Sequence, residues 1–543
     1  MDQAGQGKGR TPRSRNTQRT PGDDPYESDY LALFAAFDDD ASGTLERDEL
    51  LSHLAEVGIL PDDPRVQPLL EAAGDVPDQG ASLDYAGFRS LIEPISALIS
   101  RVAGGRLAVP DFGGLAADID RIYADLQSET GGKVADYIPQ LAQVDPDQFA
   151  ISVCTVDGQR HTVGDADEPF CLQSISKAIG YCLALEEHGV DKVHQHVGRE
   201  PSGVAFNALT LNPRGRPHNP MINAGAIMCC SLIRPGGLLA DRFDHVMRTW
   251  ERLTGRRPGY ANATYLSERA TADRNFALAY FMRENGAFPR DTDIVETLEF
   301  YFQCCSIEIT AQMLAVAAAT LANGGVNPLT RERVFSEVTV QHCLSLMVSC
   351  GMYDYSGEFA FTVGLPAKSG VAGDLMVVVP QLLGVSVWSP RLDELGNTVR
   401  GIEVCNRLVE LYQVHPHATS ADAARKDLRK RRGADTAELV TALCWAAGQG
   451  DLGEVRRLAA TGVDLSAANY DLRTALHLAA SEGRTDVVEY LLAHGADPGR
   501  VDRRQATPLD DAERDGHGDV ADLLRAATKR RPPVKGQKGK GRR

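Results

Sequence analysis

The C-terminal part of the chain repeats itself at an interval of 33 residues, and no other feature constrains the fold as strongly. The segment "ALCWAAGQGDLGEVRRLAATGVD" begins at Ala442, and "ALHLAASEGRTDVVEYLLAHGAD" begins at Ala475. A third copy, "PLDDAERDGHGDVADLLRA", begins at Pro508. Two equal intervals of this length indicate units of one turn and two antiparallel helices, which bury their Ala and Leu faces by stacking on neighbouring units.

The second copy carries "RTALHLAA", which resembles the T-P-L-H-x-A signature of ankyrin repeats, whose period is also 33 residues. Gly462 and Gly495 end two of the predicted helices and are expected to take the left-handed conformation that such turns require. We therefore predict an ankyrin block over residues 436–526, in preference to an unrelated array of helical hairpins. About three repeats is near the minimum for stability, so this block is expected to dock on a protein partner or on the rest of its own chain.

Length, charge and cysteine usage limit the remaining possibilities. The chain has 543 residues, enough for three or four domains, and its net charge of −17 argues against a molecule that binds nucleic acid with its whole surface. Its 11 cysteines are scattered without a C-x-x-C pair, which favours a reducing compartment over a disulfide framework or a zinc site. No apolar run reaches the ~20 residues of a membrane span, and no secretory signal is visible. We expect a cytoplasmic protein without a membrane-bound part.

Changes in composition along the chain divide it into six segments. We predict a disordered basic arm, a helical domain, a large mixed domain, a charged linker, the ankyrin block and a disordered basic tail; their ranges are 1–25, 26–104, 110–415, 416–435, 436–526 and 527–543. Our first interpretation of the tail is a solvated segment, and our second is a basic segment that attracts anionic partners.

The helical domain contains a candidate calcium loop. In "DDDASGTLERDE", oxygen-bearing side chains alternate and a glycine stands at the sixth position, the pattern of an EF-hand loop. The predicted calcium ligands are Asp38, Asp40, Ser42, Thr44 and Glu49. The expected partner loop, "DVPDQGASLDYAGF", lacks the required carboxylates. An EF-hand pair with one candidate calcium site is our prediction, and a plain solvated connection between helices is the alternative.

The mixed domain contains a serine and a lysine three residues apart, Ser174 and Lys177, in "FCLQSISK". On a helix these side chains share one face, so that a neutral lysine can take the hydroxyl proton of the serine. The surrounding residues are mostly apolar, and burial lowers the pKa of a lysine. Far downstream lies Lys368-Ser369-Gly370, and the combination is the motif pair of serine β-lactamases and penicillin-binding proteins, in which the second motif lies on an edge strand beside the nucleophile helix.

At this point the sequence resembles a specific family. Residues 112–413 are similar to the serine-dependent glutaminases over nearly their whole length, in collinear order. The stretches that carry the resemblance are "GKVADYIPQLA", "FCLQSISK", "VGREPSG", "PHNPMINAGAI", "SERATADRN", "FYFQCCSIE", "CGMYDYSGEFAF", "LPAKSGVAGD" and "LDELGNTVRG". An EF-hand-like region before this domain and ankyrin repeats after it resemble the long form of these enzymes.

The resemblance implies a fold, a reaction and a set of residues. The fold is an α+β core of the serine β-lactamase/transpeptidase type, flanked by all-α EF-hand-like and ankyrin regions. The reaction is hydrolysis of the side-chain amide of L-glutamine, without a catalytic cofactor. The implied catalytic residues are Ser174 as nucleophile, Lys177 as base, Tyr353 as proton relay and Val371 as a backbone oxyanion donor. The implied substrate-binding residues are Tyr137, Gln173, Ser174, Asn223, Glu268, Asn275, Tyr301, Tyr353 and Val371.

Two alternatives remain open from the sequence. One is a β-lactamase-like serine hydrolase, which shares both motifs. The other is a calcium-responsive ankyrin scaffold whose catalytic core is vestigial. The resemblance also implies a homo-oligomer, either a dimer or a tetramer, whereas activity on asparagine, a response to phosphate and the ligand of the ankyrin block are not legible in the sequence.

Overall fold

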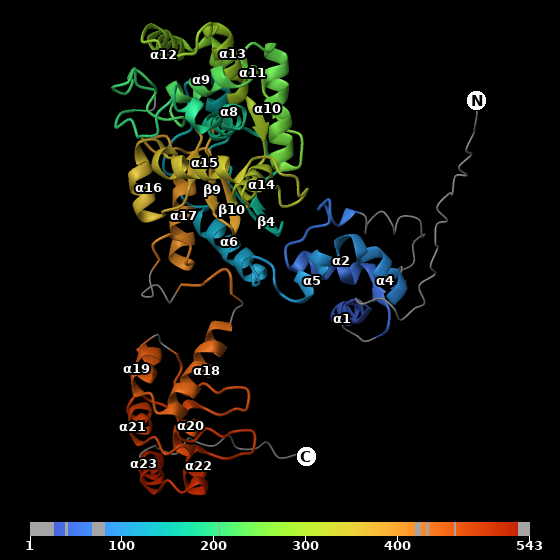
Figure 1. Ribbon diagram of the computed structural model, residues 1–543, viewed down its shortest axis with the longest axis vertical. Helices are drawn as coiled ribbons and strands as arrows, with labels where there is room; N and C mark the ends of the chain where they lie inside the picture. The colour runs from blue at the N-terminus through green and yellow to red at the C-terminus, as the bar shows by residue number, and fades with distance from the viewer. Residues whose placement is uncertain are drawn as a thin grey trace, which may run out of the picture. The chain divides into compact units, whose positions relative to one another are not determined.

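The computed structural model describes residues 27–38, 42–67, 82–205, 207–418, 425–430, 434–460 and 463–529 (Figure 1). It separates into two units, residues 1–107 and residues 108–543, and each is described by itself. The predicted basic arm, residues 530–543 of the predicted basic tail, Asp40 and Gly462 lie outside the described residues, whereas residues 527–529 are the end of a helix.

The first unit is built from helices that enclose a small apolar core around Phe34, Leu54 and Phe88. Its elements are α1 (Glu27–Phe37), β1 (Leu45–Glu46), α2 (Arg47–Glu56), β2 (Ser82–Leu83), α4 (Tyr85–Ile92), the 3-10 turn η1 (Glu93–Ile95) and α5 (Ser96–Ala103). Strands β1 and β2 pair antiparallel, with Leu45 opposite Leu83. Leu45 stands at the eighth position of the predicted calcium loop, so the pairing joins this loop to the second helical pair.

The predicted calcium loop is closed by its first residue. The Asp38 carboxylate accepts hydrogen bonds from the backbone N–H groups of Ser42 and Gly43, both at 3.0 Å. Gly43 has a φ of 79°, which agrees with the glycine expected at the sharp turn. Ser42 and Thr44 lie in the same turn, and the Ser42 hydroxyl donates to the Thr44 carbonyl at 2.6 Å. The side chain of Glu49, on α2, lies outside what the structure describes.

The catalytic part of the second unit contains an antiparallel five-stranded sheet in the order β4-β3-β10-β9-β8. The strands are β3 (Ala150–Thr155), β4 (Arg160–Gly164), β8 (Ala367–Ser369), β9 (Asp374–Val379) and β10 (Leu383–Trp388). Both faces of the sheet are covered. In β9, Met376 and Val378 join one core, whereas Leu375 and Val377 join the other, which explains why this strand is apolar at almost every position.

Helix α14 (Ala311–Ala322) packs on one face of the sheet, against β3, β9 and β10. The other face is covered by α6 (Phe112–Leu126) and α17 (Val399–Leu411) (Figure 1). The close approach of α14 requires a glycine in β10, because a Cβ on Gly384 would lie 2.3 Å from the backbone nitrogen of Ala319. Small residues on the helix and a glycine on the strand thus bring the two backbones together.

A mainly helical half lies beside the α14 face. Its helices are α8 (Ser176–Val193), α9 (Asn223–Leu232), α10 (Leu239–Thr254), α11 (Asn262–Ala270), α12 (Asp273–Glu284), α13 (Ile294–Cys305) and α15 (Glu337–Cys350). A small sheet of order β5-β7-β6 joins β5 (Phe170–Cys171), β7 (Ile307–Ile309) and β6 (Gly259–Tyr260). Short pieces complete this part: α7 (Pro139–Ala142), η2 (Gln173–Ile175), η3 (Tyr353–Tyr355) and α16 (Ser356–Thr362).

Part of the segment predicted as a charged linker packs on the catalytic core. Leu428 is buried in the cluster that contains α6 and α17, and Tyr412 pairs with Lys426 in a parallel bridge. Lys426 also forms an ion pair with the buried Asp118 of α6. A lysine of the charge run therefore has a buried acidic partner, which the sequence pattern alone does not reveal. Residues 425–430 thus differ from the predicted solvated linker.

The repeat region consists of three helical pairs in the predicted order. The helices are α18 (Ala434–Gln449), α19 (Leu452–Ala460), α20 (Ala475–Ser481), α21 (Thr485–Ala493), α22 (Pro508–Asp515) and α23 (Gly518–Lys529). The second and third repeats begin with threonine caps, and Thr474 exchanges hydrogen bonds with His477 as Thr507 does with Asp510. Gly495 has a φ of 92°, as expected.

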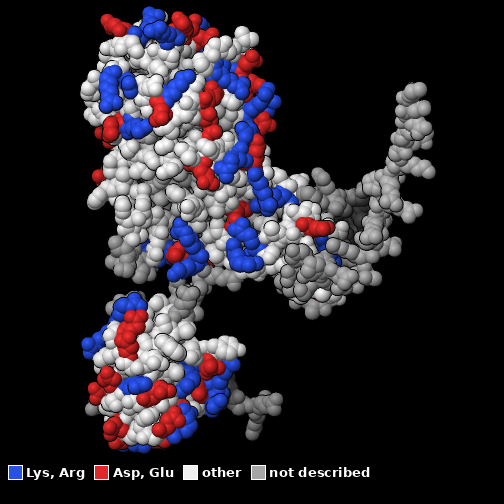
Figure 2. Space-filling model, in the orientation of Figure 1, with Lys and Arg blue, Asp and Glu red and all other residues white. Residues whose placement is uncertain are grey.

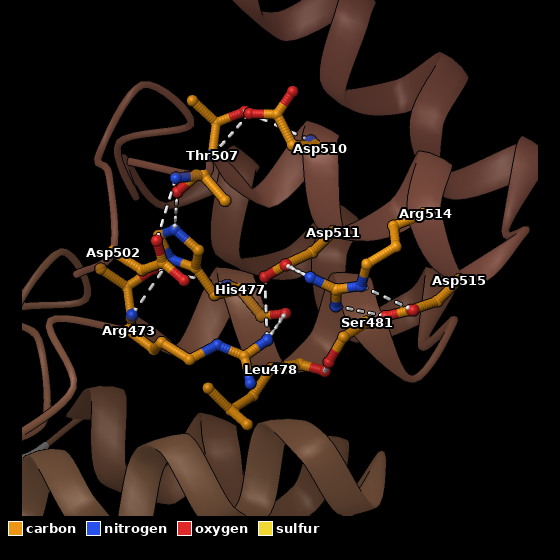
Figure 3. Close-up of polar contacts among 12 residues, drawn as sticks. Arg473, His477, Leu478, Ser481, Asp502, Thr507, Asp510, Asp511, Arg514 and Asp515 are labelled. Carbon is orange, nitrogen blue, oxygen red and sulfur yellow. Dashed lines mark hydrogen bonds and ion pairs between the residues drawn. The ribbon is translucent and has the colours of Figure 1, made fainter. Parts of the chain in front are cut away.

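A buried carboxylate joins the second and third repeats (Figure 3). Asp511 accepts hydrogen bonds from Arg473 at 2.8 Å and from Arg514 at 2.6 Å. His477 lies nearby and bonds through Nε2 to the Ala506 carbonyl at 3.1 Å. Polar contacts between successive repeats thus add specificity to the stacking of their Ala and Leu faces.

Charged side chains of both signs lie on the surface of the second unit (Figure 2). Figure 2 shows Lys and Arg side chains interspersed with Asp and Glu side chains over the catalytic part and over the ankyrin part, on the face in view. Among the described helices, none combines the length and the apolar character that crossing a membrane requires.

Candidate active site

The contact between Ser174 and Lys177 lies at the junction of η2 and α8. Both side chains are buried, with exposed fractions of 5% and 4%. The Lys177 ammonium nitrogen lies 2.6 Å from Ser174 Oγ. Burial lowers the pKa of Lys177, although neighbouring groups such as Cys305, Glu268 and Asp374 act against that shift. A lysine held in this environment is suited to take the hydroxyl proton from the serine.

The edge strand β8 packs against η2, so that the second motif lies beside the first. Lys368 is completely buried and donates hydrogen bonds to the carbonyls of Gly351 at 3.1 Å and Ser369 at 2.7 Å. Its Nζ lies 4.6 Å from the centre of the Tyr353 ring. Burial and the nearby Lys177 lower the pKa of Lys368 well below its ordinary value. The predicted placement of the Lys-Ser-Gly motif on an edge strand is therefore confirmed.

Tyr353 lies beside Lys368, in the 3-10 turn η3. Burial raises the pKa of its phenol, and a hydrogen bond with Ser174 acts in the opposite direction. Its φ is 51°, and Gln173, next to Ser174, has a φ of 43°. Two non-glycine residues in the left-handed region cost free energy that the surrounding packing must offset. Such strain concentrates at sites where a side chain must be held in one orientation.

Ser174 and Lys177 line a cavity of about 310 Å³. The predicted residues that line it are Tyr137, Gln173, Ser174, Lys177, Asn223, Glu268, Asn275, Tyr301 and Val371. The structure therefore gathers these side chains from the segment before α7, from η2, α8, α9, α11, α12 and α13, and from the turn after β8. Tyr353 is not among the residues that line this cavity; it borders a neighbouring cavity together with Met221 and Cys350. The volume fits an amino acid, with room for water.

A buried carboxylate forms one wall of the cavity. Glu268 accepts hydrogen bonds from the Tyr137 hydroxyl at 2.7 Å and from Gln173 Nε2 at 3.0 Å. Burial raises the pKa of Glu268, while these two bonds and the charge of Lys177 act against the shift. The ring of Tyr137 remains about half exposed, at 47%, so it forms the outer edge of the cavity. This wall is suited to receive an ammonium group.

Amide side chains lie in the same cavity. Asn223 Nδ2 donates to Asn275 Oδ1 at 3.0 Å, which joins α9 to α12. Asn223 is the first residue of α9, directly after the cap residue Ile222. Glu268 and Asn275 lie on different helices, because α11 ends at Ala270 and α12 begins at Asp273. The two residues line one cavity through tertiary packing.

Sequence reasoning missed five residues of the cavity wall, namely Asn207, Thr271, Ala272, Arg274 and Cys305. Arg274 Nε donates to the Asn207 carbonyl at 3.0 Å and so holds that part of the chain beside α12. Arg274 stands next to Asn275 in the resembling stretch "SERATADRN", and Cys305 follows Tyr301 by one helical turn. The only signal in the sequence for these missed residues was that they stand near predicted site residues along the chain.

Within the described residues, no group of three or more His, Cys, Asp or Glu side chains is arranged to hold a metal ion. The site itself offers a serine hydroxyl, a buried lysine amine beside it and the buried phenol of Tyr353.

Comparison with known proteins identifies the three parts of the chain. The family model for glutaminases matches residues 132–417, and the model for an EF-hand domain matches residues 30–110. The model for ankyrin repeats in three copies matches residues 403–502 and 443–531. The predicted fold, with its α+β core between EF-hand and ankyrin regions, is confirmed.

Individual relatives carry the same name. The chain is 42% identical over 451 residues to "Putative glutaminase 3" of Caenorhabditis elegans, covering 81% of this chain and 77% of that protein. It is 44% identical over 425 residues to "Glutaminase liver isoform, mitochondrial" of Rattus norvegicus, covering 77% and 71%.

Solved structures agree. One is a probable glutaminase from Bacillus subtilis complexed with 6-diazo-5-oxo-L-norleucine, 32% identical with a TM-score of 0.50 over 56% of this chain and 96% of that one. Another is Mglu in its L-glutamate binding form, 39% identical with a TM-score of 0.52 over 55% and 67%. The glutaminase family model matches more than half of this chain, and the chain matches its relatives over most of their length. The chain therefore belongs to the glutaminase family.

Proposed function

We propose that this enzyme hydrolyses the side-chain amide of L-glutamine to L-glutamate and ammonia through an ester on Ser174. Membership of the glutaminase family and the names of its relatives support the reaction. The observation that carries the serine mechanism is the 2.6 Å contact between Lys177 Nζ and Ser174 Oγ at a cavity of amino-acid size.

In the first half of the proposed reaction, Ser174 Oγ attacks the carboxamide carbon and its proton passes to neutral Lys177. The negative charge that develops on the carboxamide oxygen is stabilised by the backbone N–H groups of Ser174 and Val371, and one such donor contributes about 3–4 kcal/mol. The C–N bond then breaks, and ammonia leaves with a proton delivered from Lys177 or through the Tyr353 phenol.

In the second half, water attacks the ester carbon and gives a proton to the lysine–tyrosine pair. The ester bond breaks, Ser174 recovers its proton, and L-glutamate is released. Overall, one amide and one water are converted to one acid and one ammonia. This stoichiometry requires no oxidant, reductant or metal. The raised pKa of Tyr353 keeps the phenol protonated and able to donate.

The residues that bind each end of the substrate are assigned by charge. We propose that Glu268, with Tyr137 and Gln173 bonded to it, receives the α-ammonium group. Asn223, Asn275 and Tyr301 are proposed to hold the carboxylate and the amide by hydrogen bonds.

The remaining expectations also stay proposals. We propose the domain division given above, except that residues 425–430 of the predicted linker pack on the catalytic part. We also propose a homo-oligomer and a protein partner for the ankyrin block, which the repeat match supports. The free, buried cysteines fit a reducing compartment. The cytoplasm remains our prediction, while the relative from Rattus norvegicus is named mitochondrial.

We also propose that the EF-hand region binds calcium. The match to the EF-hand family and the bonds that Asp38 makes within its loop support this proposal. Asp38, Ser42 and Thr44 would supply ligands together with Asp40 and Glu49, and the ion would play no part in the chemical step.

Calcium binding is measured by titration of the chelator-treated full chain with Ca²⁺ in a calorimeter. We expect a dissociation constant between roughly 10⁻⁷ and 10⁻³ M, the range of sensor and extracellular EF-hand sites, and loss of binding in Asp38→Ala. The same heat in wild type and Asp38→Ala, or no heat in either, would show that the loop is a solvated connection. Ammonia release with and without Ca²⁺ then tells whether the ion regulates the enzyme.

Removal of the charge on Glu268 tests the ammonium site. Because a hydrogen bond between charged groups contributes ~1.5–3 kcal/mol, Glu268→Gln is expected to raise the KM for L-glutamine by at least about tenfold. Glutaramate, which has the amide and carboxylate but no ammonium group, is the matched control. Equal losses on both compounds would mean that the variant distorts the site and that Glu268 does not read the ammonium.

Removal of the Ser174 hydroxyl tests the nucleophile. Ser174→Ala is expected to lower kcat for ammonia release by roughly four orders of magnitude or more, because nucleophile and base act as a unit. Ser176→Ala is the matched control, since its hydroxyl donates to the Gln173 carbonyl at 2.6 Å; kcat within about tenfold of wild type is expected for it.

Three results would overturn this assignment. Substantial ammonia release by Ser174→Ala would exclude the serine mechanism. Hydrolysis of a chromogenic cephalosporin in preference to L-glutamine would favour the β-lactamase-like alternative. Folded wild type that releases no ammonia, even with phosphate, would favour the scaffold.

A further inference from the structure

A buried carboxyl group that the proposed mechanism does not use lies under the turn that carries Val371. Asp374 is the first residue of β9 and is completely buried. The turn from Gly370 to Gly373 is closed by two backbone bonds, from Gly370 N to Asp374 O at 2.8 Å and from Gly373 N to Gly370 O at 3.1 Å. The aspartate thus belongs to the structure that presents the proposed oxyanion donor.

The carboxyl group touches the turn directly. A Cβ added to Gly370 would lie 2.1 Å from Asp374 Oδ1 and 2.6 Å from Oδ2. A glycine is therefore required at position 370 to make room for the carboxyl. From the other side, Trp388 Nε1 donates to the Ala372 carbonyl at 3.1 Å. The turn is held between the indole of β10 and the carboxyl of Asp374.

The surroundings of this carboxyl do not suit a charge. Among the ion pairs of the described residues, none includes Asp374, and both of its oxygens are shielded from solvent without a side-chain donor. Lys368 gives its hydrogen bonds to the carbonyls of Gly351 and Ser369 instead. A buried carboxylate without a bonded cation is costly, so the neutral acid is the form that fits this position.

We propose that Asp374 is a positioning residue whose neutral carboxyl supports the Gly370–Gly373 turn beside Ser174, and whose ionisation inhibits the enzyme. This inference rests on the proposed serine mechanism, because it assigns the turn the task of holding the developing oxyanion. A negative charge under the turn opposes the negative charge that forms on the substrate oxygen.

The titratable groups around Asp374 couple it to the catalytic residues. Burial raises the pKa of Asp374 to about 8, while the backbone N–H groups of Asp374 and Ala372 and the charges of Lys368 and Lys177 act against the shift. In return, the carboxylate raises the pKa values of four surrounding groups, Lys177 on α8, Lys368 on β8, Tyr353 in η3 and Cys171 on β5. Ionised Asp374 would therefore keep Lys177 protonated and unable to act as a base.

The ionisation of Asp374 determines the direction in which kcat changes with pH. Below the pKa of Asp374 the acid is neutral, the turn is supported and Lys177 loses its proton more readily. Above about pH 8 the carboxylate disfavours both the neutral lysine and the oxyanion, so kcat of the wild type should fall. The readout must be kcat at saturating substrate, because the ammonium group of free glutamine titrates in a similar range and affects kcat/KM.

The test is the pH profile of kcat for Asp374→Asn, which keeps the shape of the carboxyl and cannot ionise. We expect wild type to lose activity above about pH 8 and the variant to keep a plateau there, so that the ratio of kcat at pH 9 to kcat at pH 7 rises at least about threefold. Asp118→Asn is the matched control, because Asp118 is another fully buried carboxyl of the same unit and is ion-paired with Arg121. It is expected to lower the thermal stability and to leave the shape of the profile unchanged.

The pH profiles of the variants either support or overturn the proposed role of Asp374. An Asp374→Asn profile that parallels wild type, whatever its height, would overturn the inference and leave the serine mechanism untouched. An alkaline loss that disappears in both aspartate variants would also overturn it, as an effect of stability. If Asp374→Asn does not fold, Asp374→Ser and Asp374→Gly, which cannot ionise either, replace it with the same expected profile. Failure of the serine mechanism shows separately, as ammonia release by Ser174→Ala.

Discussion

The desolvation of Lys177 is the constraint on which the rest of the site depends. A lysine in water is protonated and cannot take a proton from a serine, whereas burial lowers its pKa and allows the neutral amine. The 2.6 Å contact with Ser174 is useful only in that environment. The apolar packing of α8 against α9 and α15 is therefore part of the chemistry as well as of the stability.

The two halves of the catalytic part meet at this lysine. The sheet contributes its edge strand β8, which carries Lys368, and the turn that carries Val371. The helical half contributes the polar groups that face the cavity, Glu268 and Asn223 among them. Backbone strain at Gln173 and Tyr353 marks the same junction, and the buried Asp374 lies beneath it. Charges in this region influence one another because little water separates them.

Local patterns in the sequence were sufficient for some of these features and not for others. The repeat at Ala475 and Pro508 was legible because each unit is a short-range pattern stacked on its neighbour. Ser174 and Lys177 were legible because one helical turn joins them. Arg274 was missed, since its contact with Asn207 joins residues far apart in the chain. The packing of Lys426 on Asp118 was missed for the same reason: a charge run shows its charges and gives no sign of a buried partner.

The most direct measurement of the central claim is to map where an electrophilic glutamine analogue attaches. The chain is incubated with 6-diazo-5-oxo-L-norleucine, digested, and analysed by mass spectrometry, with and without excess L-glutamine as competitor. We predict a single adduct on Ser174, which L-glutamine suppresses and which Lys177→Met forms much more slowly. An adduct on Cys305 or another residue, with Ser174 unmodified in inactivated enzyme, would contradict it.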